Sequence, residues 1–308
     1  MYVLHLSGDT VKILEGSASK KKVVINSLYS IATPSDYLDS PDDKGYEKLE
    51  SVVINALREL GEEVKNKKVK IILDNINISF REMLVPTLNR AKTIALIKNE
   101  IFSDEKLARN NTVDYIVDEN KVDGLKQSKV FVTYVYNKIL GDMQKLGKTL
   151  MCNIVSIDIG QNCTLKHLAY IQDRLPDNYL FVEIRESAIV ISFIVDKKFK
   201  YSMSKSVISM QSMKFKNDKM YFVNDVMNTI RSAVELYKKR FPENDFNDIV
   251  LAGTEEKLDL LRKPVAEKHN LNVLNLELPD NVESIGIEEY NDFFCTIGGL
   301  MNLSMLKR

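Results

Sequence analysis

Histidine and cysteine, the side chains that most often bind metals or act as nucleophiles, are scarce in this sequence. It has three of each: His5, His167 and His269, and Cys152, Cys163 and Cys295. No HExxH spacing joins the histidines, and three scattered cysteines are too few for a disulfide framework or a zinc cage. We therefore expect free thiols, as in a reducing compartment, and no metal site.

Two short glycine-containing runs come nearest to a motif. Ser7-Gly8-Asp9 has the residue types of a tight turn between strands, because Gly and Asp tolerate positive φ. Ile157-Asp158-Ile159-Gly160 is an Asp-x-Gly string, but apolar residues at helical spacing follow it, so we expect Asp158 at a strand end or helix cap. The sequence has no Gly-x-Ser-x-Gly, no Walker loop and no kinase signature.

The composition is that of a soluble globular protein of two-domain length, at roughly 150 residues per domain. The 308 residues carry 43 Lys+Arg and 43 Asp+Glu, so the formal net charge is zero. Without a basic field, we expect no nucleic-acid partner. No apolar stretch approaches the roughly 20 residues that span a bilayer, so we expect no direct membrane insertion. The N-terminus lacks a signal-like apolar region, which favours the cytoplasm.

The elements that must position any site follow one order, which occurs twice. In the first half, alternating apolar residues predict strands at 2–6, 10–15 and 22–29. An amphipathic helix at 45–61 and a strand at 69–73 follow.

The second half repeats this order. The pattern predicts a three-stranded meander at 179–184, 188–195 and 198–207, and then an amphipathic helix at 222–241. The remaining expected elements are a strand at 249–252, a helix at 255–269, a strand at 271–276 and a closing helix at 290–305.

The same order of three strands, a helix and a further strand thus occurs in each half. This duplication predicts an α/β protein of two halves, each with a mixed sheet, around a cleft. We place the halves at 1–177 and 178–308. The first half is longer because of an insert at about 76–150. The insert has its own expected elements: a helix at 87–101, strands near 112–117 and 129–136, and a second helix at 136–146. We therefore expect a small α/β subdomain.

This duplicated order with an insert resembles the actin-like (ribonuclease H-like) fold, and within it the PilM family of type IV pilus assembly proteins. That family opens with an Ile-Asp-Ile-Gly-x-x-x-x-Lys phosphate hairpin. The matching run here is Leu4-His5-Leu6-Ser7-Gly8-Asp9-Thr10-Val11-Lys12. Lys12 matches, whereas His5 stands in place of the acidic residue and Ser7 in place of the glycine.

The family's second phosphate hairpin corresponds to residues 182–187, where Glu183 keeps a carboxylate and Arg185 occupies the glycine position. The resemblance implies that any nucleotide would contact Gly8, Lys12, Glu183, Ser187 and Gly253. Glycines let backbone N–H groups approach phosphate, and acidic residues hold Mg²⁺ through water. Because side chains replace both features, we expect no cofactor and no ATPase activity. Binding of ATP with Mg²⁺ is the open alternative.

The resemblance also implies a protein partner. In PilM-like proteins, the groove between the first domain and the inserted subdomain holds the short cytoplasmic tail of PilN, an inner-membrane protein. Pro86 and Glu100 match a family stretch in which a proline precedes a helix that carries a glutamate, and Leu96 is an apolar residue of that helix. We expect these three residues to contact a PilN-like tail.

The sequence therefore predicts a cytoplasmic scaffold of the type IV pilus assembly platform, recruited to the inner face of the cell membrane by its partner. The pilus assembly motor ATPase is a second candidate partner. Two alternative functions are a nucleotide-binding actin-like ATPase and an actin-like scaffold of cell division or type II secretion.

Overall fold

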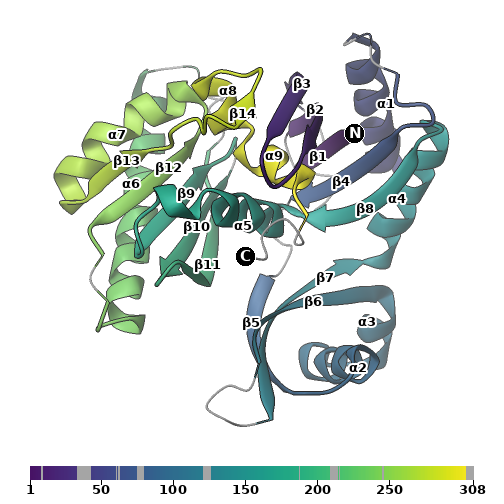
Figure 1. Cartoon of the computed structure of the whole chain (residues 1–308), viewed down its shortest axis with the longest axis horizontal. Helices are drawn as coiled ribbons and strands as arrows, with labels where there is room; N and C mark the ends of the chain where they lie inside the picture. The colour runs from purple at the N-terminus through teal and green to yellow at the C-terminus, as the bar shows by residue number, and fades with distance from the viewer. Residues whose placement is uncertain are drawn as a thin grey trace.

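Both predicted meanders are present in the computed structural model, and the first builds a six-stranded sheet (Figure 1). In spatial order its strands are β14 (Val282–Glu283), β3 (Val23–Ala32), β2 (Thr10–Ala18), β1 (Tyr2–Ser7), β4 (Lys68–Asp74) and β8 (Asn153–Ile159). The strands β1, β2 and β3 pair antiparallel, whereas β4 runs parallel to both β1 and β8. The sheet is mixed, as predicted.

Helices cover both faces of this sheet. The apolar sides of α1 (Asp43–Glu59) and α4 (Asn137–Thr149) bury one face together with Leu4 and Ile71. On the other face lie α5 (Gly160–Tyr170) and α9 (Phe294–Leu300), and the short 3₁₀ helix Gln172–Arg174 follows α5 in the chain. Burial of apolar surface on both faces is the main stabilising term for such a layer arrangement.

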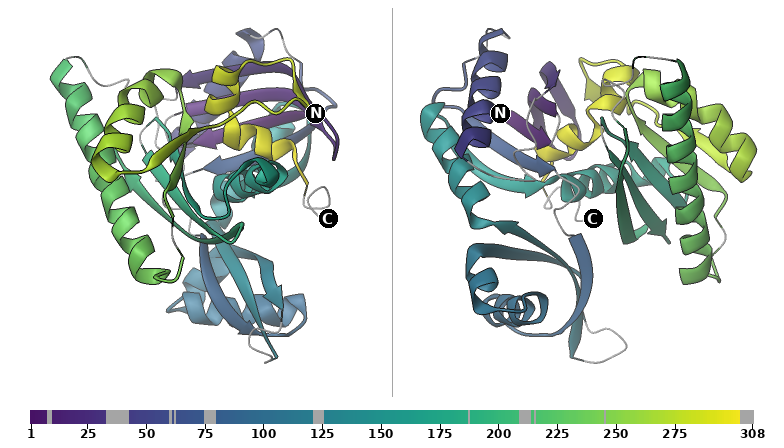
Figure 2. Two further views of the ribbon diagram at one scale, coloured as in Figure 1. Left: turned by 60° about the vertical axis from the view of Figure 1, so that its left-hand side comes forward. Right: turned by 180° about the vertical axis from the view of Figure 1, so that it is seen from behind.

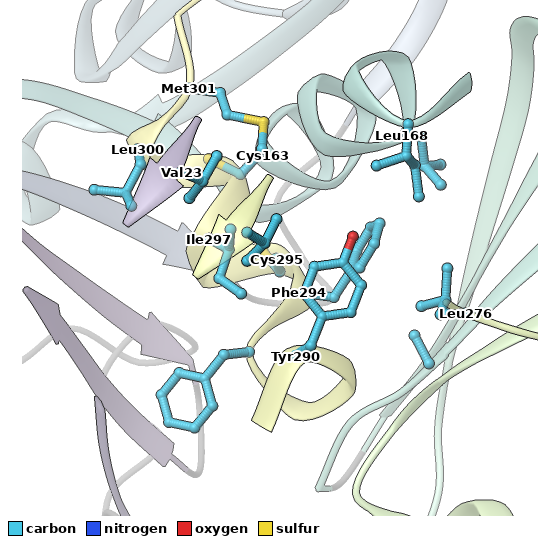
Figure 3. Packing of buried hydrophobic residues seen from close by; sticks show 14 of the residues in the cluster. Val23, Cys163, Leu168, Leu276, Tyr290, Phe294, Cys295, Ile297, Leu300 and Met301 are labelled. Carbon is cyan, nitrogen blue, oxygen red and sulfur yellow. The ribbon is translucent and has the colours of Figure 1, made fainter. Parts of the chain in front are cut away.

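The second meander builds a five-stranded sheet. In spatial order its strands are β11 (Lys198–Ser206), β10 (Ala188–Val195), β9 (Tyr179–Ile184), β12 (Asp248–Gly253) and β13 (Asn272–Asn275). One face packs on α6 (Lys216–Arg240) and α7 (Glu255–His269). The other face contributes Phe181 and Val250 to the cluster around α5 and α9, so these two helices lie between the sheets (Figure 3).

The insert is an antiparallel three-stranded sheet with helices on one face, and it lies at one end of the molecule (Figure 2). Its elements are β5 (Phe80–Pro86), α2 (Arg90–Ile101), α3 (Glu105–Asn110), β6 (Asn111–Asn120) and β7 (Gln127–Tyr136). The expected helix at 87–101 and the two strands are confirmed, and β5 and α3 are additional. The helix expected at 136–146 is present as α4, but it packs on the first sheet and not in the insert core. The expected start of the helix at residue 87 was early, because Asn89 caps α2 by accepting a hydrogen bond from the Lys92 N–H.

The expected single closing helix at 290–305 is wrong. The structure has α8 (Ile287–Asp292) and α9, separated at Phe293, and the backbone is extended at Met301. The Lys70 ammonium group lies 3.4 Å from the Leu300 and Met301 carbonyl oxygens, which stabilises the C-terminal end of α9. The sequence placed everything after residue 177 in the second half, whereas β14 and α9 pack with the first sheet.

The structure describes residues 1–7, 10–32, 43–59, 61, 63–74, 80–120, 126–186, 188–208, 214, 216–244 and 246–302. Within these ranges, no helix combines the length and the apolar character needed to cross a membrane.

Candidate functional site

A cavity of about 150 Å³ opens at the cleft between the two halves. It lies at the carboxyl ends of β1, β4, β9 and β12, which is where open α/β sheets usually bind ligands. Its charged lining consists of Lys12, Asp74, Glu183, Arg185, Glu186, Lys257 and Asp292.

Arg185 bridges the two halves across this cavity. It directly follows β9, and its guanidinium donates from Nη1 to Asp74 Oδ1 at the end of β4 over 2.5 Å. From Nη2 it donates to Glu183 Oε2 over 2.9 Å. Burial alone would raise the pKa of the Asp74 carboxyl, but the charges of Arg185 and the hydrogen bond from His5 hold that pKa below its usual value. Asp74 is therefore an ionised, buried partner of Arg185.

The two lysines of the cavity also have partners from the protein. Lys12 Nζ donates to the Asp292 side chain over 2.7 Å and to its carbonyl oxygen over 2.6 Å. Lys257 Nζ donates to Glu186 Oε2 over 2.6 Å and to the Arg185 carbonyl oxygen over 3.1 Å. Each cation that could attract a phosphate thus already contacts a carboxylate.

The charge of the described lining is unfavourable for polyphosphate. Four carboxylates face three cations, which leaves one net negative charge when His5 is neutral. A nucleotide triphosphate would add several negative charges to this partly buried site and would have to displace existing ion pairs. A bound cation would instead offset the net negative charge of the cavity lining.

The structure brings together three of the five residues that the resemblance assigned to a nucleotide. Lys12, Glu183 and Gly253 all line the cavity, whereas Gly8 and Ser187 lie outside the described residues. Gly253 has a local structural reason to be glycine: its φ is +148°, and a Cβ there would lie 2.6 Å from the Ile184 carbonyl oxygen.

Sequence reasoning missed the partners of these residues. Asp74, Lys257, Asp292 and Cys295 line the same cavity but lie far apart in the chain. A signal existed for Asp74, because a carboxylate that ends a buried apolar strand lies at the edge where ligands gather. The other three depend on tertiary packing.

A second hollow, of about 330 Å³, separates the first half from the insert. One wall is the face of the insert sheet that points away from α2, with Ile116, Phe131 and Val135. The opposite wall comes from α4 and from the end of β8, including Leu140 and Ile157. We call this hollow the insert groove. Among the residues described, it is lined mainly by apolar side chains and by no lysine or arginine.

The three residues predicted to bind a partner lie away from the insert groove. Pro86 is exposed at the end of β5, Glu100 is exposed on α2, and Leu96 is half-buried against the core of the insert. Leu96 and Glu100 belong to α2, whereas Pro86 is the last residue of β5, and the role of all three in binding stays a prediction.

Asp158 lies in the groove rather than in the cleft cavity, and the chain passes there from β8 directly into α5, as predicted. Its Oδ1 accepts from the Ile159 N–H and from Asn162, and its Oδ2 accepts from Lys166 over 2.7 Å.

By sequence, the chain matches no family model and no curated protein. Its structure is similar to a chain of the PilM–PilN type IV pilus biogenesis complex, with a TM-score of 0.77 and 14% identity over 99% of this chain and 98% of that chain. A Bacteroides thetaiotaomicron protein of unknown function with an actin-like ATPase fold follows, with a TM-score of 0.56 and 12% identity over 97% and 94% of the two chains. The cytoplasmic domain of EpsL, from the Vibrio cholerae type II secretion system, gives a TM-score of 0.50 and 9% identity over 100% and 95%. The predicted actin-like fold is confirmed.

Proposed function

We propose that this protein is a scaffold of a type IV pilus assembly platform and acts by binding a cytoplasmic segment of a PilN-like membrane protein. The observation that carries this proposal is the full-length likeness to a chain of a PilM–PilN complex. In this proposal the protein works at the inner face of the membrane because its partner holds it there. The pilus motor ATPase is a further candidate partner.

The insert groove is the site that best suits such a segment. It has apolar walls for a few side chains, and it adjoins β8 and β6, each of which has only one neighbouring strand among the described residues. An extended peptide can pair with a free strand edge while alternate side chains enter pockets. The groove therefore supports binding of a short, extended, mainly apolar segment.

The cleft cavity supports a function without nucleotide turnover. Arg185 occupies the second hairpin's glycine position and pairs with Asp74 and Glu183, so its side chain already provides positive charge between the halves. We infer that the protein needs neither ATP nor Mg²⁺ to hold its fold, and that it is not an ATPase.

The test is binding of a synthetic peptide from the N-terminal cytoplasmic tail of the PilN-like partner to the full chain. Ile116→Asp puts a charge into the apolar wall and should weaken binding at least about tenfold, which corresponds to about 1.4 kcal/mol. Val117→Asp is the matched control, since Val117 is the next residue of β6, is exposed, and does not line the groove.

Equal binding by both variants would place the peptide elsewhere, and Glu100→Ala then tests the α2 side. No binding to the wild-type protein would contradict the proposal. Binding instead to the membrane partner of a type II secretion system would favour the alternative suggested by the likeness to EpsL.

A further inference from the structure

Three metal-binding types of side chain meet at the inner wall of the cleft cavity. His5 comes from β1, Asp74 from the end of β4, and Cys295 from α9. Their ligand atoms all lie within 4.8 Å of one another, all three residues are buried, and all three line the cavity. The cluster is thus enclosed by protein but open to small solutes on one side.

The imidazole of His5 is oriented as in protein zinc sites. Its Nδ1 hydrogen-bonds to Thr296 Oγ1 over 2.8 Å, and this contact directs Nε2 towards Asp74 Oδ2, 2.9 Å away. Cys295 Sγ lies 4.0 Å from the same Nε2. Metal-bound histidines usually hydrogen-bond through their second nitrogen in this way. Ligand atoms around a tetrahedral Zn²⁺ are separated by roughly 3.3–3.8 Å, so small side-chain movements would complete the site.

The surroundings suit a cation. The cavity lining carries one net negative charge with His5 neutral, and Arg185 holds Oδ1 of Asp74 while Oδ2 faces the cluster. Asn291 also lines the cavity, is 4% exposed, and its Oδ1 has no hydrogen-bond partner within the described part of the chain. A water molecule in the fourth position of a metal could donate to this oxygen.

We propose that His5, Asp74 and Cys295 bind one divalent transition metal ion of the Zn²⁺ class, with water as the fourth ligand. The mixed nitrogen, oxygen and sulfur set suits Zn²⁺ or Co²⁺ and does not suit Mg²⁺, which requires oxygen ligands. On binding, the Cys295 thiol loses its proton to solvent and the sulfur bonds to the metal as a thiolate. The neutral His5 imidazole changes tautomer, so that the proton leaves Nε2, which binds the metal, and is carried on Nδ1, which then donates to Thr296 Oγ1. The ion would join β1, β4 and α9 directly beneath the bridge that Arg185 makes.

Cobalt is the probe, because a Co²⁺–thiolate bond absorbs in the near ultraviolet. The experiment uses the full-length, metal-free chain with Cys152→Ser, which removes the half-buried third thiol. One equivalent of Co²⁺ should produce the thiolate charge-transfer band, and Zn²⁺ should abolish it by displacing Co²⁺. Adding Cys295→Ser should eliminate the band. Adding Cys163→Ser, at an equally buried cysteine that does not line the cavity, should leave it unchanged.

The result that overturns the proposal is the absence of a band, or a band that survives Cys295→Ser. If Cys295→Ser does not fold, Thr296→Val decides, because it keeps the shape but removes the hydroxyl that orients His5. It should weaken Co²⁺ binding roughly 10–100-fold, and equal affinity would overturn the site. The outcome is independent of peptide binding in the insert groove.

Discussion

Arg185 occupies the hairpin position where the family resemblance expects glycine, and it contacts a carboxylate from each half of the molecule. Without this residue, Asp74 and Glu183 would lose their shared counter-charge in a partly buried site. The free-energy cost of an unpaired buried carboxylate is larger than the net gain from forming the pair. Removing Arg185 should therefore cost more stability than its two ion pairs contribute, because the substitution leaves buried carboxylates without a counter-charge.

Substitution of Arg185 by alanine should lower the free energy of unfolding by about 3–5 kcal/mol, because it leaves buried charge uncompensated. Urea denaturation at neutral pH measures the change. The control is Arg174→Ala, which removes an ion pair to Asp280 whose carboxylate side chain is 98% exposed. That change should cost less than about 1 kcal/mol. Similar losses in both variants would show that Asp74 and Glu183 do not depend on Arg185.

The helices α5, α8 and α9 pack between the two sheets. The buried, neutral His167 of α5 contacts residues of both α8 and α9. His167 Nδ1 lies 2.8 Å from the Phe294 carbonyl oxygen, which can only accept, so Nδ1 carries the proton. The Tyr290 hydroxyl then donates to His167 Nε2 over 2.9 Å, and the Phe294 ring stacks on the imidazole. Both nitrogens are occupied by partners that fit only the neutral tautomer.

The free energy of unfolding should fall as the pH is lowered from the pKa of His167 in the unfolded protein to its lower pKa in the folded protein. Burial lowers its pKa from 6.5 to about 4, so in this interval the unfolded state binds a proton that the folded state does not. The free energy of unfolding should therefore decrease by about 1.4 kcal/mol per pH unit from about pH 6.5 down to about 4. The pKa of Asp74 lies below its usual value, so its contribution is lost only at lower pH.

Urea denaturation across this pH range checks the prediction. His167→Met cannot be protonated, so this variant should be less stable at neutral pH but should show a shallower pH slope. Burial also lowers the pKa of His269, which leaves a residual slope in both proteins. Equal slopes would contradict the role of His167.

The packing of α5 against α9 depends on glycine at their closest approach. A Cβ at Gly298 would lie 2.1 Å from the Cys163 carbonyl oxygen, whereas one at Gly141 in α4 would meet nothing within 4 Å. Gly298→Ala should destabilise the protein by about 1–3 kcal/mol or more, because the helices must move apart. Gly141→Ala should stabilise it by about 0.5–1 kcal/mol. Thermal and urea unfolding measure both, and equal effects would contradict this account of the contact.

The elements that the sequence predicted correctly are those whose pattern is local. In the meander strands and in helices such as α1 and α4, apolar residues recur at the spacing of a strand or of a helix. The buried side of each element can therefore be predicted from the sequence. The break at Phe293 has no such signal, because mainly apolar residues continue through 293–301, and α8 and α9 are separated only by how each packs in the folded protein. The strand β5 was missed because its side chains alternate little and only pairing with β7 defines it.

The same distinction applies to the candidate sites. The sequence placed Lys12, Glu183 and Arg185 in hairpins and indicated that Arg185 would occupy phosphate space. It could not show that Asp74, 111 residues away, would pair with Arg185. The cluster of His5, Asp74 and Cys295 was likewise invisible, since α9 returns to the first sheet only through tertiary packing.

On the scale of the whole molecule, the two halves are joined by side chains at the cleft cavity, where the family resemblance would place a nucleotide. The shared cluster around α5 and α9 contains residues from both sheets, and Arg185 adds a charged bridge above it. Closure of a cleft normally requires a ligand that binds the closed form more tightly than the open one. Here the protein itself supplies those contacts, so closure should not depend on nucleotide.

ATP with Mg²⁺ should therefore leave the melting temperature of the wild-type protein unchanged. A ligand that binds only the folded state at 100 times its dissociation constant would add about 2.7 kcal/mol of stability, so true binding would be easy to detect. Differential scanning fluorimetry with ATP, with and without Mg²⁺, makes the measurement, and Lys12→Ala is the matched variant because Lys12 is the cation that the family's first hairpin shares. A Mg²⁺-dependent rise that is lost in Lys12→Ala would contradict the scaffold proposal and would favour the nucleotide-binding alternative, because the ion pairs of Lys12 and Arg185 would then have to open for phosphate.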